Sequence, residues 1–233
     1  MIYISGSNIN HLFGAIATTI LVEGHENNPR GLKTLELNDA WLEVEDISDP
    51  IISLKSRKLD LDYLDKEMEW YHSGSLMACD ISENASMWDR IKDTNGTVNS
   101  NYGFLTMVQK WGGKSQLEWC VDSLIKDPNT RQAVMNYNQP IHKYNGVKDF
   151  VCTLTQTFIK RAGRLDTIVL MRSNDIIYGL SYDIPWFAYV QKKVSEETGI
   201  PIGKYNHYAT SLHVYEKHFD MIEGMSNERV HER

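Results

Sequence analysis

Residues 150–157 read FVCTLTQT, in which threonine alternates with other side chains from residue 153 and one thiol, Cys152, lies near the start. β-branched and aromatic residues in alternation predict a strand, and the turn-forming residues 144–146 precede it. We therefore expect Cys152 to be held on a stiff element. A thiolate is a strong nucleophile when nearby positive charge lowers its pKa. An isolated cysteine is more often an inert core residue, so the rest of the chain has to decide.

The composition predicts one domain over residues 1–233. The chain has 233 residues and 42% hydrophobic content, which is enough for one core, and it shows no repeat or break in composition. The net charge of −7 argues against general affinity for nucleic acid or for anionic lipid. We expect no nucleic-acid partner and no membrane association.

The N-terminus and the cysteines indicate a cytoplasmic protein. No signal-peptide pattern is present, and no apolar run approaches the roughly 18 residues of a membrane span. Cys79, Cys120 and Cys152 form an odd, widely spaced set, which fits a reducing compartment better than disulfides. Neither Cys-x-x-Cys nor His-Glu-x-x-His spacing occurs, so we predict no metal site.

Periodic apolar residues predict the main elements. Helices are expected over residues 8–22, from 60 to a stop at Gly74, over 87–92, over 115–126, and from near Pro185. Strands are expected over 32–37, 41–44, 133–137, 165–171 and 206–212. The segments 25–31 and 99–103 are expected to be a loop and a turn, and residues 161–164 a tight turn.

Several polar residues occupy positions where sites are often built. Residues 172–175 directly follow a buried strand, and side chains gathered at such ends often form sites. His213 and Tyr215 are two residues apart and should point to the same side of a strand. Glu67 lies beside Trp70, and burial there would raise its pKa; taken alone, an exposed glutamate is the simpler interpretation. The same holds for Arg30 and Arg131, since a lone arginine is usually a solvated charge.

Taken together, these segments resemble the thymidylate synthase superfamily, and especially its phage-type deoxycytidylate hydroxymethylase branch. The resemblance covers roughly residues 29–218. It is carried by the order and spacing of 67–71 (EMEWY), 99–103 (NSNYG), 127–131 (DPNTR), the Cys152 strand, 171–175 (MRSND) with Gly179, and 212–215 (LHVY).

The resemblance implies an α+β fold of three layers, with a mixed twisted sheet flanked by helices. It also implies a homodimer in which two such sheets pack back to back. Cys152 falls on the family's nucleophile, Glu67 on its proton-relay glutamate, and Tyr102 beside the nucleophile. Positions that fall on nucleotide-phosphate ligands are Arg172 and Ser173 of the same subunit and Arg131 lent by the partner. Arg30, in its polar loop, is a further candidate for binding the phosphate. Gln132 stands where many relatives have a second arginine.

The resemblance also implies two substrates, a pyrimidine deoxynucleoside monophosphate and the reduced folate 5,10-methylenetetrahydrofolate. Trp88, Asp175, Gly179 and Tyr182 fall on the folate-binding surface, whereas His213 and Tyr215 fall on the deoxyribose hydroxyl. Ser173 is expected in members that use deoxynucleotides.

These residue types suit one-carbon transfer to C5 of a pyrimidine. C5 is a weak nucleophile, and addition of the Cys152 thiolate at C6 activates it. Asp183 stands where thymidylate synthases place an asparagine. A carboxyl group and cytosine that share one proton can form hydrogen bonds to both the ring nitrogen and the amine of cytosine. A carboxylate that faces uracil instead repels the lone pairs of its carbonyl groups. A mismatch of this kind in a buried site discriminates by about 10⁴-fold, and Asp183 could also help to protonate the ring nitrogen.

The product is less strongly determined than the base. Synthases that transfer hydride usually carry a second tryptophan three residues after Trp88, but here that position is Ile91. The C-terminal residues 226–233 (SNERVHER) are charged and unlike the tail that seals those sites. A wetter pocket lets water reach the intermediate, with Glu67 directing it through ordered water. We therefore expect hydroxymethylation of dCMP.

Three alternatives remain open at this point. One is reductive methylation of dCMP or dUMP with release of dihydrofolate. A second is hydroxymethylation of dUMP or CMP. The third, from a different class, is a catalytically silent nucleotide-binding relative, which the joint presence of Cys152, Glu67, Arg172 and Asp183 disfavours.

Overall fold

The computed structural model describes residues 1–228, and these residues form two compact units. Unit 1 combines residues 1–59 with the chain from residue 160 onward, and unit 2 comprises residues 60–159. The single domain expected from composition stays a prediction. No helix among the described residues is long and apolar enough to cross a membrane.

Unit 1 is built on a mixed sheet. Its strands, in spatial order, are β1 (Ile2–Gly6), β3 (Thr34–Val44), β10 (Ile202–Tyr215) and β8 (Arg164–Met171). The β1–β3 and β10–β8 pairs are parallel, whereas β3 and β10 run antiparallel. Two short strands extend it, β2 (His25–Asn27) beside β3 and β9 (Asn174–Asp175) beside β10.

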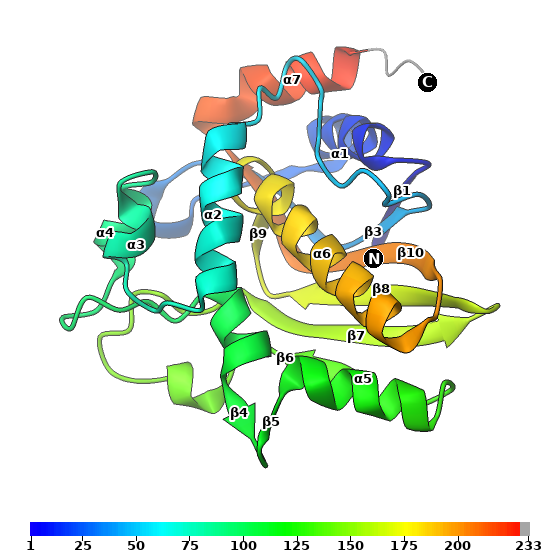
Figure 1. The fold of residues 1–233 in the computed structure, drawn as a ribbon. Coiled ribbons are helices and arrows are strands. Elements are labelled where there is room, and N and C mark those ends of the chain that lie inside the picture. The colour runs from blue at the N-terminus through cyan, green and yellow to red at the C-terminus, as the bar shows by residue number, and fades with distance from the viewer. Residues whose placement is uncertain (229–233) are drawn as a thin grey trace. The chain divides into compact units, whose positions relative to one another are not determined.

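Helices flank this sheet. α1 (Ile9–Glu23) packs against β1, β3 and α7 (Phe219–Asn227), and α6 (Ser181–Thr198) packs on β8 and β10 (Figure 1). Shorter helical segments are η1 (Pro29–Gly31), the π-helix η4 (Ile176–Leu180) and η5 (Glu216–His218). Leu12, Ile16 and Ile20 of α1 are fully buried, as their spacing of four residues predicts. The expected mixed sheet flanked by helices is confirmed; dimer packing stays a prediction.

Unit 2 is mainly helical. Its helices are α2 (Leu61–Ser73), α3 (Cys79–Ser82), α4 (Met87–Ile91), the π-helix η2 (Phe104–Val108), α5 (Gln116–Lys126) and η3 (Pro140–His142). β4 (Lys110–Trp111) pairs with β5 (Lys114–Ser115), and β6 (Val134–Asn136) pairs antiparallel with β7 (Thr153–Arg161). The last two residues of β7 belong to unit 1.

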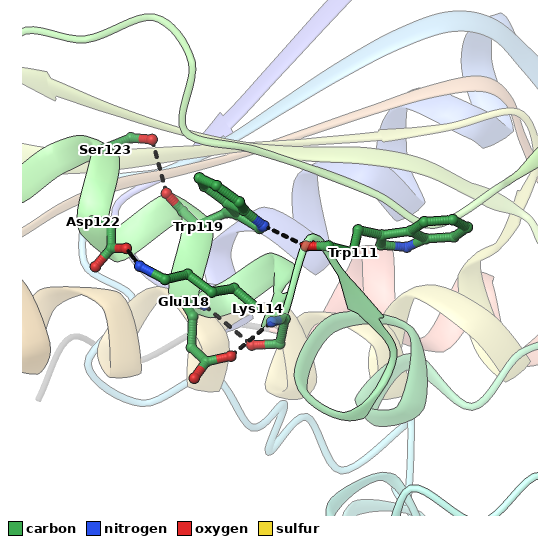
Figure 2. A network of polar contacts seen from close by, with 7 residues as sticks. Trp111, Lys114, Glu118, Trp119, Asp122 and Ser123 are labelled. Carbon is green, nitrogen blue, oxygen red and sulfur yellow. Dashed lines mark hydrogen bonds and ion pairs between the residues drawn. The ribbon is translucent and has the colours of Figure 1, made fainter.

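Capping residues explain why the predicted helices form where they do. Asp60 accepts a hydrogen bond from the Tyr63 N–H at the start of α2, and Gly74 ends that helix with a φ of 64°. At the start of α5, Ser115 and Glu118 form a reciprocal capping box (Figure 2). Helix signals in the sequence therefore coincide with the observed ends.

Figure 2 shows how side chains tie α5 to the hairpin before it. Lys114 forms an ion pair with Asp122 on the next turn of α5. The Trp119 indole N–H donates to the Trp111 carbonyl at 2.9 Å, and the Ser123 hydroxyl donates to the Trp119 carbonyl at 2.8 Å. The hairpin and α5 thus form one local structure.

Several expectations about strands and loops were wrong in detail. Residues 32–37 and 41–44 are not separate strands, because the β3–β10 register runs on from Ala40 to Asn38 although Asp39 has a φ of 55°. The turn preference of asparagine and aspartate suggested a break that tertiary pairing overrides. The expected loop 25–31 contains β2 and η1, and the turn 99–103 leads directly into η2.

Two corrections concern elements next to predicted site residues. β7 begins at Thr153, so Cys152 immediately precedes the strand instead of lying within it. The helix expected near Pro185 begins at Ser181 and contains that proline. A proline at the fifth helical position lacks the N–H that would bond the Ser181 carbonyl, which is why the sequence pattern indicated a start rather than an interior.

His207 is a fully buried histidine in β10, and we expect it to make the fold acid-sensitive. Burial lowers its pKa from 6.5 to about 3, and its Nε2 has no partner among the described residues. Because the folded pKa is depressed, its neutral ring imposes no penalty above pH 6.5, and stability falls below that pH as the unfolded state takes up the proton. At pH 5 the loss is about 2 kcal/mol.

Denaturant unfolding of the wild type and of His207→Phe between pH 5 and 7.5 measures this effect. The variant should lose the histidine-dependent slope, whereas replacing the exposed His72 by glutamine should leave it in place. Equal slopes in the wild type and His207→Phe would show that another group causes the acid sensitivity.

Candidate active site

In unit 2 Cys152 is half-buried, and the residue that follows it contacts an anchored tyrosine. The Thr153 hydroxyl donates to the Tyr102 hydroxyl at 2.9 Å. The Tyr102 ring stacks on Tyr71 at 5.2 Å and meets the edge of Tyr137 at 5.3 Å. Tyr102 is therefore fixed beside the residue that follows Cys152. Its place beside the thiol itself stays a prediction.

A glycine and a buried carboxylate fix the segment around Tyr102. A Cβ on Gly103 would lie 1.7 Å from the Tyr71 carbonyl oxygen, so only glycine fits there. The Asp149 carboxylate accepts the N–H groups of Asn99 and Ser100 at 2.6 and 2.7 Å. Because Asp149 lies three residues before Cys152, it ties the 99–103 turn to the chain that leads to the thiol.

Glu67 is buried, with 6% of its surface exposed, so the interpretation of an exposed glutamate is wrong. The Tyr63 hydroxyl donates to its carboxylate at 2.5 Å, and the Trp88 indole N–H donates to the Tyr63 oxygen at 3.2 Å. The ring of Trp70 lies 4.8 Å from that of Trp88. Two residues predicted for the site, Glu67 and Trp88, are thus joined through Tyr63.

Sequence reasoning missed Tyr63. Its spacing of four residues from Glu67 on a predicted helix was an available signal, because side chains at i and i+4 lie on the same face. The order Trp88, Tyr63, Glu67 forms a chain of hydrogen bonds that ends on a carboxylate in aromatic surroundings. Each hydrogen bond in such a chain polarises the next, and the chain orients the carboxylate.

In unit 1 a second group of predicted residues gathers after β8. Arg172 and Ser173 form a half-buried bend, followed by the short β9. The Asn174 amide donates to the Asp183 carboxylate at 2.7 Å. A Cβ on Gly179 would lie only 3.3 Å from an Asp183 carboxylate oxygen. The backbone of the η4 turn therefore passes close over Asp183.

Asp183 is an acid whose ionisation is balanced near neutral pH. Burial raises its pKa from 3.8 to about 6, the hydrogen bond from Asn174 lowers it, and the charge of Asp175 raises it further. Sequence reasoning did not single out Asn174, although it lies in the 171–175 motif. The protonated and ionised forms of the Asp183 carboxyl are therefore both populated near pH 6.

Asp175 presents a buried acceptor. One carboxylate oxygen accepts the N–H groups of Ile177 and Tyr178 at 2.7 and 2.9 Å and so caps η4. The other oxygen is buried and has no partner among the described residues. Buried polar atoms are normally hydrogen-bonded, so this oxygen indicates a ligand that donates to it. Gly179 and Tyr182 lie on the same turn and on the helix that follows it.

His213 and Tyr215 lie on the same side of β10, which confirms the spacing argument. Their rings meet edge to face with centroids 5.4 Å apart. Glu36 of β3 is the register partner of His213, and Asn27 donates to its carboxylate at 2.6 Å. Burial opposes ionisation of Glu36, but hydrogen bonds from Ser211 and Asn27 and the His213 charge keep its pKa below the usual value.

The remaining predicted residues are exposed. Arg30 lies in η1 with a φ of 55°, a backbone conformation that is uncommon for residues other than glycine. Arg131 precedes β6. Neither arginine forms an ion pair with another described residue. The structure therefore does not join them to the two groups above.

A surface groove of about 550 Å³ in unit 2 contains none of the predicted residues. It is lined by Trp111, Gln116, Asn136, Asn138, Gln139, Pro140 and Ile141. Its lining has no charged side chain, so it does not suit a phosphate. Within residues 1–228, no group of three or more His, Cys, Asp or Glu side chains is arranged to hold a metal ion.

Comparison with known proteins places this geometry in a family. A family model described as thymidylate synthase matches residues 11–232. The chain belongs to the thymidylate synthase family. The structure also resembles a solved structure of thermostable thymidylate synthase A from Bacillus subtilis, with a TM-score of 0.75 and 21% identity over 94% of this chain and 84% of the other. That likeness confirms the fold.

Other members of the thymidylate synthase family are similar in sequence. Deoxycytidylate 5-hydroxymethyltransferase of Enterobacteria phage T6 is 31% identical over 83% of this chain and 80% of its own. The enzyme of the same name from phage T4 is 30% identical over the same shares. Deoxyuridylate hydroxymethyltransferase of Bacillus phage SP01 is 26% identical over 91% of this chain and 58% of its own.

The contact between Asn174 and Asp183 gives a measurable prediction. Replacing Asn174 by leucine removes a donor that stabilises the ionised carboxylate, so the Asp183 pKa should rise above its value of about 6. Titration of ¹³C-labelled aspartate by NMR, with Asp183→Asn to assign the signal, measures the shift. Asn206→Leu, at another buried asparagine of unit 1, should leave the Asp183 titration unchanged. An Asp183 pKa that stays the same in Asn174→Leu would contradict the prediction.

Proposed function

We propose that this chain transfers a one-carbon unit from 5,10-methylenetetrahydrofolate to C5 of dCMP, with addition of water to give 5-hydroxymethyl-dCMP and tetrahydrofolate. The observation that carries the proposal is the buried Asp183 carboxyl with its pKa of about 6. Two relatives at about 30% identity are named deoxycytidylate 5-hydroxymethyltransferases, which supports the same assignment.

Asp183 selects the base through its proton. The cytosine edge offers a ring nitrogen that accepts and an amine that donates. A single proton held between the carboxyl and the ring nitrogen lets one carboxyl oxygen engage N3 while the other accepts from the amine. Uracil presents an N–H flanked by carbonyl oxygens, and a carboxylate repels the carbonyl that replaces the amine. The Asn174 hydrogen bond fixes which way the carboxyl faces.

Cys152 activates the ring. Its thiolate adds to C6, forming a carbon–sulfur bond and moving the electron pair of the C5–C6 double bond onto C5. Protonation of the ring nitrogen through Asp183 assists this addition. When the C5 proton has been removed and the C5 substituent is complete, the sulfur leaves C6 and the double bond re-forms. Arg172 and Ser173, with Arg30, bind the nucleotide phosphate, and the positive charge of the phosphate-binding arginines favours the Cys152 thiolate.

The residues of η4 suit a reduced folate. Asp175 has a buried oxygen without a partner among residues 1–228, and the N–H groups on a pterin edge are donors of the kind it lacks. Asp175, Gly179, Tyr182 and Trp88 would hold the folate, which supplies the one-carbon unit. His213 and Tyr215 bind the deoxyribose hydroxyl.

Glu67 directs water in the last step. Its buried carboxylate accepts a hydrogen bond from Tyr63, which in turn accepts one from Trp88, so the acceptor is held in a fixed orientation. Residue 91 is isoleucine, without the second tryptophan of synthases that transfer hydride, and this supports water as the final nucleophile. Of the charged tail, residues 229–233 lie outside the described part of the chain. A hydroxymethylase of dUMP is a second candidate, because the phage SP01 relative bears that name.

We also propose a homodimer in which Arg131 completes the phosphate site of the partner. Arg131 is exposed and forms no ion pair with any of residues 1–228, as a residue lent to a second copy requires. Gln132 beside it supplies an amide in place of a second positive charge.

The product identifies the reaction. Incubation of the protein with dCMP and methylenetetrahydrofolate should yield 5-hydroxymethyl-dCMP by mass spectrometry, with no rise in the dihydrofolate absorbance band. Methylated product together with dihydrofolate would replace hydroxymethylation by reductive methylation. Cys152→Ala should give no product; turnover equal to the wild type would exclude Cys152 as the nucleophile.

Asp183→Asn tests base selection. An asparagine amide pairs with uracil, so the ratio of kcat/KM for dCMP to that for dUMP should fall by about 10²-fold or more. Competition between the two nucleotides in one reaction, followed by product mass, gives the ratio directly. Asp166→Asn, at an aspartate of β8 in the same unit, serves as the control. An unchanged preference for dCMP in Asp183→Asn would refute this account of base selection.

A further inference from the structure

Residues 53–57 form a strap that is fixed to two helices of unit 1. The Asn10 amide of α1 donates to the Ser53 hydroxyl at 2.9 Å and accepts the Ser53 N–H at 2.8 Å. The Glu228 carboxylate, just after α7, accepts the N–H groups of Lys55 and Ser56 at 2.8 and 2.9 Å and the Ser56 hydroxyl at 2.8 Å. The strap is therefore held at both ends by side chains distant in sequence.

Close packing adds to these bonds. A Cβ on Gly224 of α7 would lie 3.0 Å from the Ser56 side chain, so the helix and the strap approach as closely as a glycine allows. Within the strap Leu54 is buried, and Ile52 just before it is buried as well. The buried apolar side chains and the hydrogen bonds together fix the backbone that leads to Arg57.

Arg57 is a buried arginine that contacts the η4 turn. Only 4% of its surface is exposed, and it forms no ion pair with a carboxylate among the described residues. Its guanidinium donates to the Ile177 carbonyl at 2.7 Å and to the Ser181 hydroxyl at 2.9 Å. It also lies 5.4 Å from the centre of the Tyr182 ring.

The contacted turn is irregular and needs support. η4 is a π-helix of five residues, and π-helical segments break the regular hydrogen-bond pattern of the backbone. The Ile177 carbonyl accepts from both Arg57 and Ser181, so these side chains satisfy a carbonyl at the junction of η4 and α6. Among residues 1–228, the buried guanidinium has these neutral acceptors and the Tyr182 face to replace its hydration, so its burial costs free energy.

We infer that Arg57 is a positioning residue for the reduced folate: the 53–57 strap holds η4 so that Asp175, Gly179 and Tyr182 face that substrate. The inference rests on the proposed function, because it takes these three residues as the folate surface. A movement of the Ile177 carbonyl would displace the two N–H groups that hold Asp175 and would shift Gly179 away from Asp183. The strap acts on the folate side of the site, whereas the nucleotide phosphate ligands Arg172 and Ser173 lie before η4.

Steady-state kinetics of two variants tests the inference. Arg57→Met keeps the length of the side chain but removes its donors, and it should raise the KM for methylenetetrahydrofolate by about 10-fold, the effect of one or two charged hydrogen bonds. The KM for dCMP should stay within about twofold of the wild type. Arg57→Lys retains a cation that can donate to the Ile177 carbonyl, and it should recover most of the folate affinity.

A second pair of variants distinguishes the proposed role of Arg57 from a general loss of stability. Glu228→Gln weakens the hold on the strap without touching η4, and it should shift the folate KM in the same direction by a smaller factor. Arg164→Met removes an arginine that donates to the Ile202 carbonyl elsewhere in unit 1 and should change neither KM. If Arg57→Met does not fold, Ser181→Ala takes its place, with the same expected direction.

The outcomes separate the inference from the proposed function. Equal changes in both KM values, or no change in the folate KM, in a folded Arg57→Met variant would overturn the role of Arg57 while the wild-type reaction stands. A wild-type protein that neither binds nor uses methylenetetrahydrofolate would overturn the proposed function and this inference together. A selective rise in the folate KM that lysine reverses supports both.

Discussion

The burial of one carboxyl, Asp183, is the constraint on which the unit 1 site depends. Taking a carboxyl out of water raises its pKa, and the Asn174 amide limits that rise, so the group gains or loses a proton near pH 6. The surrounding chain is arranged to allow this burial. Gly179 has no side chain where a Cβ would crowd the carboxyl, and η4 bends the backbone over it.

In unit 2 a second carboxyl, that of Glu67, is held by contacts of a different kind. Glu67 is buried and is oriented by a hydrogen bond from Tyr63, which is itself bonded to Trp88. Tyr102 is fixed by the stacking of Tyr71 and by the hydroxyl of the residue after Cys152. Large rigid rings lose little conformational freedom on ordering, so they hold polar atoms in place at low entropic cost. Each unit thus positions its own set of reactive groups.

Much of the fold could be predicted because its signals are local. The ends of α2 and α5 follow from Asp60, Gly74 and Ser115, whose side chains or backbone satisfy the helix termini. The failures have long-range causes. β3 continues through Asn38 and Asp39 because β10 pairs with Ala40 and with Asn38, on either side of Asp39. Asn174 meets Asp183 only because a π-helix, which apolar periodicity does not reveal, lies between them.

The site residues also divide into those that the sequence could predict and those that depend on long-range contacts. The family resemblance supplied most positions, but the partners that orient them had no family signal in the sequence. Arg57 contacts Ile177, 120 residues away, and Glu228 contacts Ser56, 172 residues away. Such contacts depend on how α7 and the strap pack, and the amino-acid pattern near each residue does not encode that.

The central claim is that the carboxyl of Asp183 selects cytosine before any chemistry occurs. Equilibrium titration of Cys152→Ala with dCMP and with dUMP, without folate, measures this selection directly because no covalent bond to the ring can form. The account predicts that dCMP binds at least about 10-fold more tightly than dUMP at neutral pH. Equal affinity for the two nucleotides, or tighter binding of dUMP, would contradict it.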